Sequence, residues 1–187
     1  TAQLLETTDA MEVVNEILIP ALDSAGKLFE QGKIFLPQLI QTASVAQAAF
    51  EVIKTTLIER NAAPVSRGEI VLATVKGDIH DIGKNIVRVL LENYGYTVLD
   101  LGRDVPCQLV ADTAKEHGVK LVGLSALMTT TLGAMEETIQ LVKQSCPDCK
   151  IVVGGAVLTA DYAEKIGADF YAKDAMETVA VAKEVVG

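Results

Sequence analysis

The sequence predicts a helical segment followed by an α/β unit, and three observations support this. Residues 1 to about 60 contain no strand-like run, short β-branched runs begin at residue 69, and amphipathic helical patterns alternate with those runs. We therefore expect a helical domain over 1–63 and an α/β domain over 64–187. A stretch with proline, serine and glycine, Asn61–Gly68, is the expected linker.

The helical segment reads as three consecutive units. Thr8-Asp9 is a capping-type pair, apolar residues follow at steps of three and four, and Pro20 marks a break or a new helix start. Gly26 and Gly32 are expected to bracket a second short helix, and Pro37 suits the first turn of a longer one. The apolar stripe of that longer helix is Leu36, Leu39, Ile40, Ala43, Ala46, Phe50, Ile53 and Leu57. Short turns between these helices predict a small antiparallel bundle.

The α/β segment alternates five apolar runs with helices. The runs are Ile70–Val75, Tyr96–Leu101, Leu121–Leu124, Ile151–Val153 and Asp169–Ala172. The helical stripes between them are Ile82, Ile86, Val89 and Leu90, and then Leu132, Met135, Ile139 and Val142. Continuous apolar strands predict a five-stranded parallel sheet with helices on both faces, in a flavodoxin-like (Rossmann-like) unit. Ligands of such sheets bind beyond the carboxyl ends of the strands, so we expect the functional residues in those loops.

Composition excludes several function classes. The chain has 187 residues, of which 50% are hydrophobic and 4% aromatic, and its 16 Lys+Arg against 25 Asp+Glu give a net charge of -9. This acidity disfavours nucleic acid and anionic lipid as partners, and the few aromatics leave little for base stacking. Polar residues interrupt each apolar stretch before the ~18 residues that span a bilayer, and no signal-peptide pattern opens the chain. We expect a cytoplasmic protein.

Three cysteines do not predict a disulfide framework. The Cys146-Pro147-Asp148-Cys149 run follows a helical pattern, whereas a redox pair opens a helix, where the dipole lowers the thiolate pKa. The run also lacks a second pair of zinc ligands at suitable spacing. We therefore expect loop thiols and no zinc in this segment.

The loop after the first strand, Lys76–Asn85, is longer and more polar than a strand-to-helix turn requires. Asp78 stands two residues before His80, close enough for its carboxylate to hold one imidazole nitrogen while the other binds a metal. One histidine supplies too few ligands for a bare metal ion. A metal here would arrive inside a cofactor that brings its other ligands.

Other interpretations of this loop stay open. Asp78 and Asp81 could cap the following helix, with His80 as a solvent-exposed loop residue. The spacing of the two loop glycines matches neither the dinucleotide fingerprint nor the P-loop motif. The second histidine, His117, stands at a predicted helix end, where it complements the helix dipole.

Three linked motifs resemble the signature of cobalamin-binding domains, which is Asp-x-His-x-x-Gly, then Ser-x-Leu, then Gly-Gly. Here they are Asp78–Gly83, Ser125–Leu127 and Gly154-Gly155, each after a predicted strand and at the family's spacing. The region Gly26–Gln38 is similar to the helical cap of cobalamin-dependent methionine synthase and of related corrinoid methyltransferase proteins. The resemblance covers essentially the whole chain.

The resemblance implies roles for individual residues. His80 would be the lower axial ligand of cobalt, Asp78 would hydrogen-bond it, and Thr131 stands where the family's proton relay has a serine. From the residues alone, Phe29 and Leu36 would be bundle core, and only the likeness makes them a shield for the upper face of the cofactor. The implied cobalamin contacts are Phe29, Leu36, Gly77, Asp78, Ile79, His80, Asp81, Ile82, Gly83, Ser125, Leu127, Thr129, Thr131, Gly154, Gly155 and Ala156.

The leading functional hypothesis is the methyl-carrier module of methionine synthase. It would move a methyl group from methyltetrahydrofolate to homocysteine through cob(I)alamin and methylcob(III)alamin. Pterin-binding and homocysteine-binding methyltransferase domains and a reductive reactivation partner would then lie in the same or separate chains, and the start at Thr1 suggests a segment of a longer polypeptide. By itself the segment would be a cofactor carrier without complete activity.

Alternatives come from the same class and from others. A stand-alone corrinoid protein for methylamine or methoxy-aromatic methyltransferases fits the same motifs. A cobalamin sensor would need a basic DNA-binding segment, and a carbon-skeleton mutase would lack the helical cap. Flavin binding on the same fold is the alternative without a corrinoid.

Overall fold

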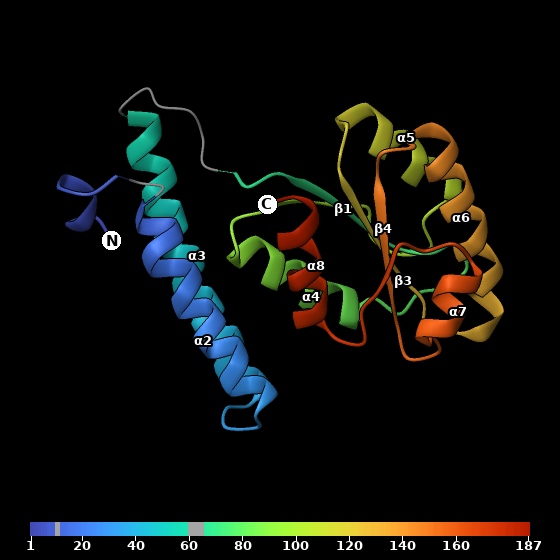
Figure 1. The fold of residues 1–187 in the computed structure, drawn as a ribbon, viewed down its shortest axis with the longest axis horizontal. Coiled ribbons are helices and arrows are strands. Elements are labelled where there is room, and N and C mark those ends of the chain that lie inside the picture. The colour runs from blue at the N-terminus through green and yellow to red at the C-terminus, as the bar shows by residue number, and fades with distance from the viewer. Residues whose placement is uncertain (10–11, 60–65) are drawn as a thin grey trace. The chain divides into compact units, whose positions relative to one another are not determined.

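The computed structural model describes residues 1–9, 12–59 and 66–187 (Figure 1). It divides the chain into two compact units: Thr1–Ser66 together with Glu92–Gly95, and Arg67–Leu91 together with Tyr96–Gly187. The expected boundary between residues 63 and 64 and most of the expected linker lie outside the described residues.

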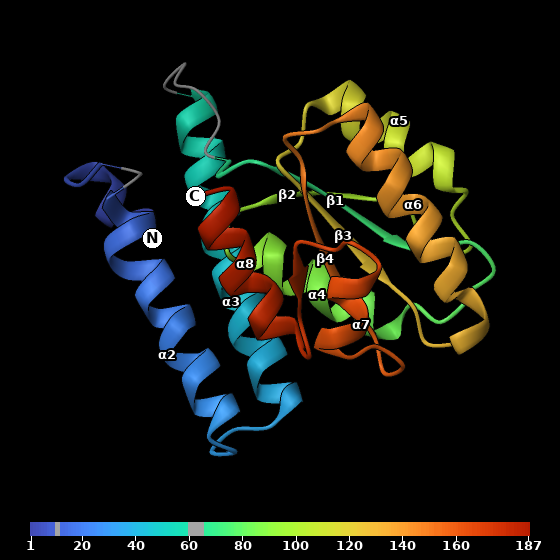
Figure 2. The same ribbon diagram turned by 45° about the vertical axis from the view of Figure 1, so that its right-hand side comes forward.

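The N-terminal unit is helical. Its elements are the 3-10 turn η1 (Leu4–Glu6), the π-helical stretch η2 (Val13–Leu18), α2 (Ile19–Glu30) and α3 (Leu36–Glu59). Pro20 lies in the first turn of α2, and Pro37 is the second residue of α3, as predicted for a longer helix. The two long helices run antiparallel (Figure 2). Leu5, Val13, Val14 and Ile53 form a small buried core.

Gly26 does not bracket a separate short helix, so that part of the prediction is wrong. The helix α2 runs through Gly26, which is buried. A helix interior accepts a glycine at a cost of about 1 kcal/mol, and burial of its neighbours outweighs this local preference. Gly32 does break the chain, since its φ of 67° places it in the left-handed region in the turn before α3. In the predicted α3 stripe, Leu39, Ala43, Ala46 and Ile53 are buried, whereas Ile40 is 39% exposed.

The second unit contains a five-stranded parallel sheet in the order β2-β1-β3-β4-β5. Its strands are β1 (Glu69–Thr74), β2 (Thr97–Asp100), β3 (Leu121–Ser125), β4 (Lys150–Gly154) and β5 (Phe170–Tyr171). Its helices are α4 (Ile82–Asn93), α5 (Cys107–His117), the 3-10 turn η3 (Thr129–Thr131), α6 (Leu132–Ser145), α7 (Ala160–Lys165) and α8 (Ala175–Val185). Every predicted strand is present, and the flavodoxin-like fold class is confirmed.

Helices cover both faces of this sheet (Figure 2). Side chains of α5, α6 and α7 pack in the main core against alternate strand residues such as Val71, Val122 and Ile151. The opposite face, which carries Leu72 and Gly123, lies beneath α4 and α8. Burial on two faces explains why the strands read as continuous apolar runs. The strand order reverses between β1 and β3, so the loops after these two strands border the switch point where ligands of such sheets bind.

Ile82 contradicts the predicted apolar stripe of α4. Within this stripe Leu90 is buried, but Ile82 is 78% exposed. Ile82 is the first residue of α4 and lies at the carboxyl edge of the sheet, where the helix begins beyond the last strand residues. A periodic pattern cannot reveal where a helix extends past the sheet that it covers.

Among the helices in the described residues, none combines the length and apolar character that crossing a membrane requires.

Candidate functional site

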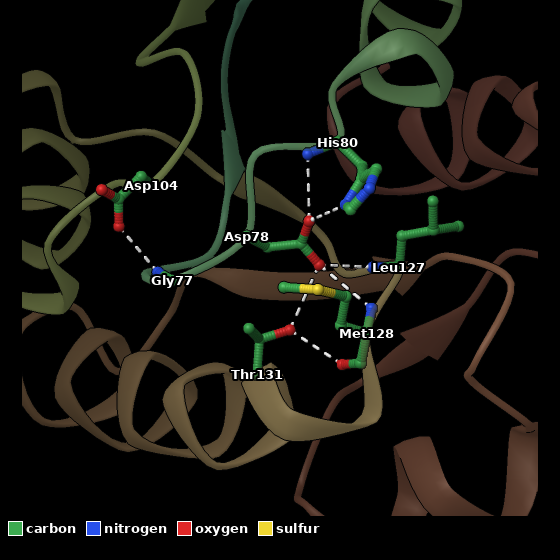
Figure 3. Close-up of polar contacts among 7 residues, drawn as sticks. All are labelled: Gly77, Asp78, His80, Asp104, Leu127, Met128 and Thr131. Carbon is green, nitrogen blue, oxygen red and sulfur yellow. Dashed lines mark hydrogen bonds and ion pairs between the residues drawn. The ribbon is translucent and has the colours of Figure 1, made fainter.

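The loops after β1 and β3 meet at the switch point. The backbone N–H of Val75 donates to the Ser125 carbonyl at 3.1 Å, and the N–H of Asp78 donates to the Val75 carbonyl at 3.0 Å. Gly77 makes this tight turn possible, because its φ of 84° is unfavourable for other residues. The turn directs the Asp78 side chain toward the β3 loop (Figure 3).

Asp78 is fully buried and joins the two loops. Its Oδ1 accepts the N–H of His80 at 3.0 Å and the Nδ1–H of the same residue at 2.8 Å. Its Oδ2 accepts the N–H of Leu127 at 2.6 Å and that of Met128 at 3.1 Å. The Thr131 hydroxyl lies 3.2 Å from Oδ2 and 2.8 Å from the Met128 carbonyl, so its single proton favours the carbonyl. These contacts are drawn in Figure 3.

The hydrogen bonds keep Asp78 ionised. Burial raises the pKa of the carboxyl, but the N–H groups of His80, Leu127 and Met128 and the His80 ring together lower the pKa from 3.8 to about 2. A carboxylate can only accept hydrogen bonds, so the proton of the His80–Asp78 pair resides on Nδ1. In the neutral imidazole, this arrangement leaves the lone pair on Nε2.

His80 has the properties of a metal ligand. Its side chain is 45% exposed although the carboxylate that holds it is not exposed at all. A histidine ligand that donates its second ring N–H to a carboxylate is oriented and made more basic by that contact. No group of three or more His, Cys, Asp or Glu side chains in residues 1–9, 12–59 and 66–187 is arranged to hold a metal ion. The donor set thus fits a metal that brings most of its own ligands.

Exposed apolar side chains stand close to His80 in sequence and on the β3 loop that binds Asp78. Ile79 is 59% exposed and Ile82 is 78% exposed. Leu127, whose N–H binds Asp78, is 42% exposed. Exposed apolar side chains gathered near a metal-type ligand are typical of a surface that binds a ligand or a partner. The predicted contacts Ile79, Ile82 and Leu127 thus lie on the His80 loop, at the start of α4 and on the β3 loop.

A cavity of about 330 Å³ opens on the α4–α8 face of the sheet. Five predicted contact residues line it, namely Gly83, Ser125, Gly154, Gly155 and Ala156. The sequence analysis did not predict the other residues that line it, which include Leu72, Lys84, Val87, Leu158, Asp174 and Thr178. These come mainly from helix faces and strand ends whose shared cavity requires the tertiary fold. Gly155 has a φ of 138°, and a Cβ there would stand 1.8 Å from the Ala126 carbonyl oxygen, so the close approach of two loops requires glycine.

Lys84 is an unpredicted buried charge beside the site. Its side chain is 2% exposed, and its ammonium group pairs with Asp100 Oδ1. Asp100 also accepts the N–H of Gly102 at 2.9 Å and pairs with Arg88 at 3.3 Å. Burial raises the pKa of Asp100, but the Lys84 hydrogen bond and the other contacts outweigh it and lower the pKa. This cluster fixes the start of α4 to the end of β2.

The remaining predicted contacts are more dispersed. Thr129 is an exposed residue at the start of η3, and the Asp81 carbonyl accepts the N–H of Asn85 at 2.8 Å inside the first turn of α4. Phe29 and Leu36 belong to the helical unit, and both are partly buried. Their contact with a cofactor stays a prediction.

Of the Cys146 and Cys149 pair, Cys149 is buried and is not a reactive thiolate. Cys146 follows the last residue of α6 as its C-cap, and the N–H of Cys149 donates to the Cys146 carbonyl at 3.0 Å in a turn before β4. Burial, Cys146 and Asp169 raise the pKa of the Cys149 thiol to about 12. A thiol that stays protonated is a weak nucleophile.

Comparison with known proteins gives a consistent result over the whole chain. Two family models, both described as "B12 binding domain", match residues 68–180 and 1–54. Dimethylamine corrinoid protein 1 of Methanosarcina acetivorans is 43% identical over 180 residues, 95% of this chain and 84% of that protein.

Two solved structures are also similar. A cobalamin-binding protein from Desulfitobacterium hafniense DCB-2 has a TM-score of 0.74 and 33% identity, over 100% of this chain and 97% of its own. The methanol:cobalamin methyltransferase complex MtaBC from Methanosarcina barkeri has a TM-score of 0.82 and 29% identity, over 97% of this chain and 69% of the matched chain.

Proposed function

The chain belongs to the B12-binding corrinoid proteins of methyltransferase systems, with cobalamin as its cofactor, and we propose that it carries methyl groups for a methylamine-type methyltransferase. The observation that carries this proposal is the 43% identity to a dimethylamine corrinoid protein over 95% of the chain. The geometry at the switch point also supports cofactor binding, because Asp78 holds the Nδ1–H of His80 at 2.8 Å.

Cobalamin, when bound, supplies a cobalt centre that accepts a methyl group from one substrate and donates it to another. His80 would ligate the cobalt through Nε2. Asp78 would keep the imidazole in the required tautomer and, by its negative charge, make it a stronger donor. Thr131 would act on this pair through Asp78 Oδ2, which lies 3.2 Å from its hydroxyl.

The other residues would hold and shelter the cofactor. The 330 Å³ cavity bordered by Gly83, Ser125 and Gly154 would receive its nucleotide tail. Ile79, Ile82 and Leu127 would cover apolar surface of the ring and exclude water from the metal ligand. Phe29 and Leu36, which belong to the helical unit, would shield the face of the cofactor that His80 does not contact.

The methylamine assignment replaces methionine synthase as the preferred hypothesis. Relatives covered over more than four fifths of their length include dimethylamine and trimethylamine corrinoid proteins, and the MtaBC structure pairs a similar chain with a methyltransferase. We therefore expect the partner to be a methyltransferase that delivers a methyl group from an amine. Pterin-binding and homocysteine-binding domains are no longer required as partners.

The test separates the donors directly. The chain, loaded with hydroxocobalamin and chemically reduced, is mixed with dimethylamine and a dimethylamine methyltransferase, with methanol and a methanol methyltransferase, or with methyltetrahydrofolate and its methyltransferase. We expect the absorption spectrum of the methylated cofactor to form with the amine pair at least ~10-fold faster than with the others. Equal or faster methylation from methyltetrahydrofolate would return the assignment to methionine synthase.

A further inference from the structure

The loop after β2 holds the His80 loop through one residue, Asp104. The Asp104 carboxylate accepts the N–H of Gly77 at 2.7 Å, and its own N–H donates to the carbonyl of Asp78 at 2.9 Å. The two hydrogen bonds run in opposite directions and hold Gly77 and Asp78, whose carboxylate orients His80. Figure 3 shows the bond from Gly77 to the Asp104 carboxylate. Asp104 does not touch the imidazole itself.

The backbone of Asp104 is adapted to this contact. Its φ is 53°, and it has the only positive φ outside glycine in the part of the chain that the structure describes. Aspartate and asparagine tolerate this left-handed conformation better than other residues with a side chain, and non-glycine outliers of this kind concentrate at functional sites. Flanking backbone bonds brace it, since the N–H of Thr74 donates to the Gly102 carbonyl at 3.0 Å and the N–H of Val105 donates to the Thr74 carbonyl at 3.1 Å.

Without Asp104, the turn at Gly77 would lose its side-chain restraint. Gly77 is exposed, and glycine is the most flexible residue, so its N–H would be free to leave the position that sets the direction of Asp78. Asp78 itself is still bound to Leu127 and Met128 from the β3 loop. Asp78 is thus held from two loops. The β3 loop contacts its carboxylate, and the β2 loop contacts its backbone.

We propose that Asp104 is a positioning residue that fixes the Gly77–Asp78 backbone and thereby the orientation of the His80 imidazole. Its effect on cofactor binding rests on the proposed function, whereas its effect on the loop does not.

The test compares Asp104→Asn, Asp104→Gly and the wild type. Asparagine keeps a carbonyl acceptor and tolerates positive φ, whereas glycine tolerates positive φ but has no acceptor. Amide exchange measured by NMR in the cofactor-free protein should be about tenfold faster at Gly77 in Asp104→Gly and within about twofold of wild type in Asp104→Asn. Equal Gly77 exchange in all three proteins, or Asn behaving as Gly, would overturn the proposal.

The cofactor readouts complete the test. Asp104→Gly should raise the dissociation constant for hydroxocobalamin about three- to tenfold and reduce the fraction of Co(II) centres with nitrogen coupling from histidine, while Asp104→Asn restores both. The two hypotheses can fail separately. If the wild type binds no cobalamin, the proposed function fails and the exchange data still decide the role of Asp104; if binding is intact and identical in all three proteins, the positioning role fails.

Discussion

The two histidines of this chain make the same contact in different surroundings. His80 Nδ1 lies 2.8 Å from Asp78, and His117 Nδ1 lies 3.1 Å from Glu69. The Asp78 side chain is 0% exposed and accepts backbone N–H groups from the β3 loop, whereas the Glu69 side chain is 41% exposed. A histidine–carboxylate pair thus becomes a candidate metal site when the carboxylate is buried and fixed by other donors. An exposed pair remains a weak surface contact.

Removal of each imidazole should give the largest difference. His80→Ala should raise the dissociation constant for hydroxocobalamin by at least ~100-fold, because it removes the proposed metal ligand itself. His117→Ala should change it less than about twofold, since that side chain is remote in the fold from the switch-point loops. Absorbance titration of the cofactor-free protein measures both. A comparable loss in the two variants would remove the distinction between the histidines.

The two carboxylates come next. Asp78→Asn should weaken cobalamin binding about 10- to 100-fold, as observed for residues that orient metal ligands. It should also lower the free energy of unfolding by about 1–3 kcal/mol, since an amide NH₂ would face buried donors. Glu69→Gln should cost less than about 1 kcal/mol and leave binding unchanged. Urea unfolding and the same titration compare the pairs; a larger effect for Glu69→Gln would contradict the comparison.

In the cofactor-free protein, the ionised Asp78 should make the free energy of unfolding depend on pH in the acid range. The pKa of its carboxyl is lowered from 3.8 to about 2, so its contribution is fully present above the unfolded pKa and is lost as the pH falls through the folded pKa. At about 1.4 kcal/mol per pKa unit, roughly 2 kcal/mol of stability should disappear between about pH 5 and pH 2 in the wild type but not in Asp78→Asn. Urea unfolding at several pH values across this window measures it. Parallel pH profiles for the two proteins would argue against an ionised, stabilised Asp78.

Glycines after the two histidines should separate ligand effects from folding effects. A Cβ at Gly83 or at Gly118 would meet no atom within 4 Å, but Gly118 has a φ of 59°. Gly83→Ala should keep or raise stability by up to ~1 kcal/mol and weaken cobalamin binding, because the added methyl group borders the cavity. Gly118→Ala should cost about 1 kcal/mol in stability and leave binding unchanged. Thermal unfolding and titration test both, and unaltered binding in Gly83→Ala would contradict a ligand at this cavity.

The smallest effect should come from Thr131. Its hydroxyl is 3.2 Å from Asp78 but 2.8 Å from the Met128 carbonyl, so Thr131→Val removes a secondary contact of the carboxylate. We expect less than about 1 kcal/mol in stability and a two- to threefold change in cobalamin affinity, with Thr131→Ser close to wild type. Thr113→Val, on the helix that ends at His117, is the control. A tenfold or larger loss in Thr131→Val would assign the hydroxyl a stronger role.

The parts of this site that could be predicted are local in sequence. Asp78 and His80 are two residues apart, so their contact follows from spacing, and the apolar runs revealed the strands because both faces of the sheet are buried. The sequence pattern does not predict contacts between segments that are far apart in the chain. Three such contacts join loops or elements from different strands. They are the hydrogen bonds from the Leu127 and Met128 N–H groups to Asp78, the Lys84–Asp100 pair, and the bond from Gly77 to Asp104. Ile82 was assigned to the buried stripe of α4 because an exposed apolar residue at the start of a helix and a core residue fit the same periodicity.

Isotope labelling of histidine tests the central claim most directly. The Co(II) form of the cobalamin-loaded chain is prepared with nitrogen-14 and with nitrogen-15 histidine, and its electron paramagnetic resonance is recorded for the wild type and for His117→Ala. We expect three-line splitting from one nitrogen to become two-line splitting on labelling, in both proteins. Splitting that does not respond to the label, or that vanishes in His117→Ala, would contradict ligation by His80.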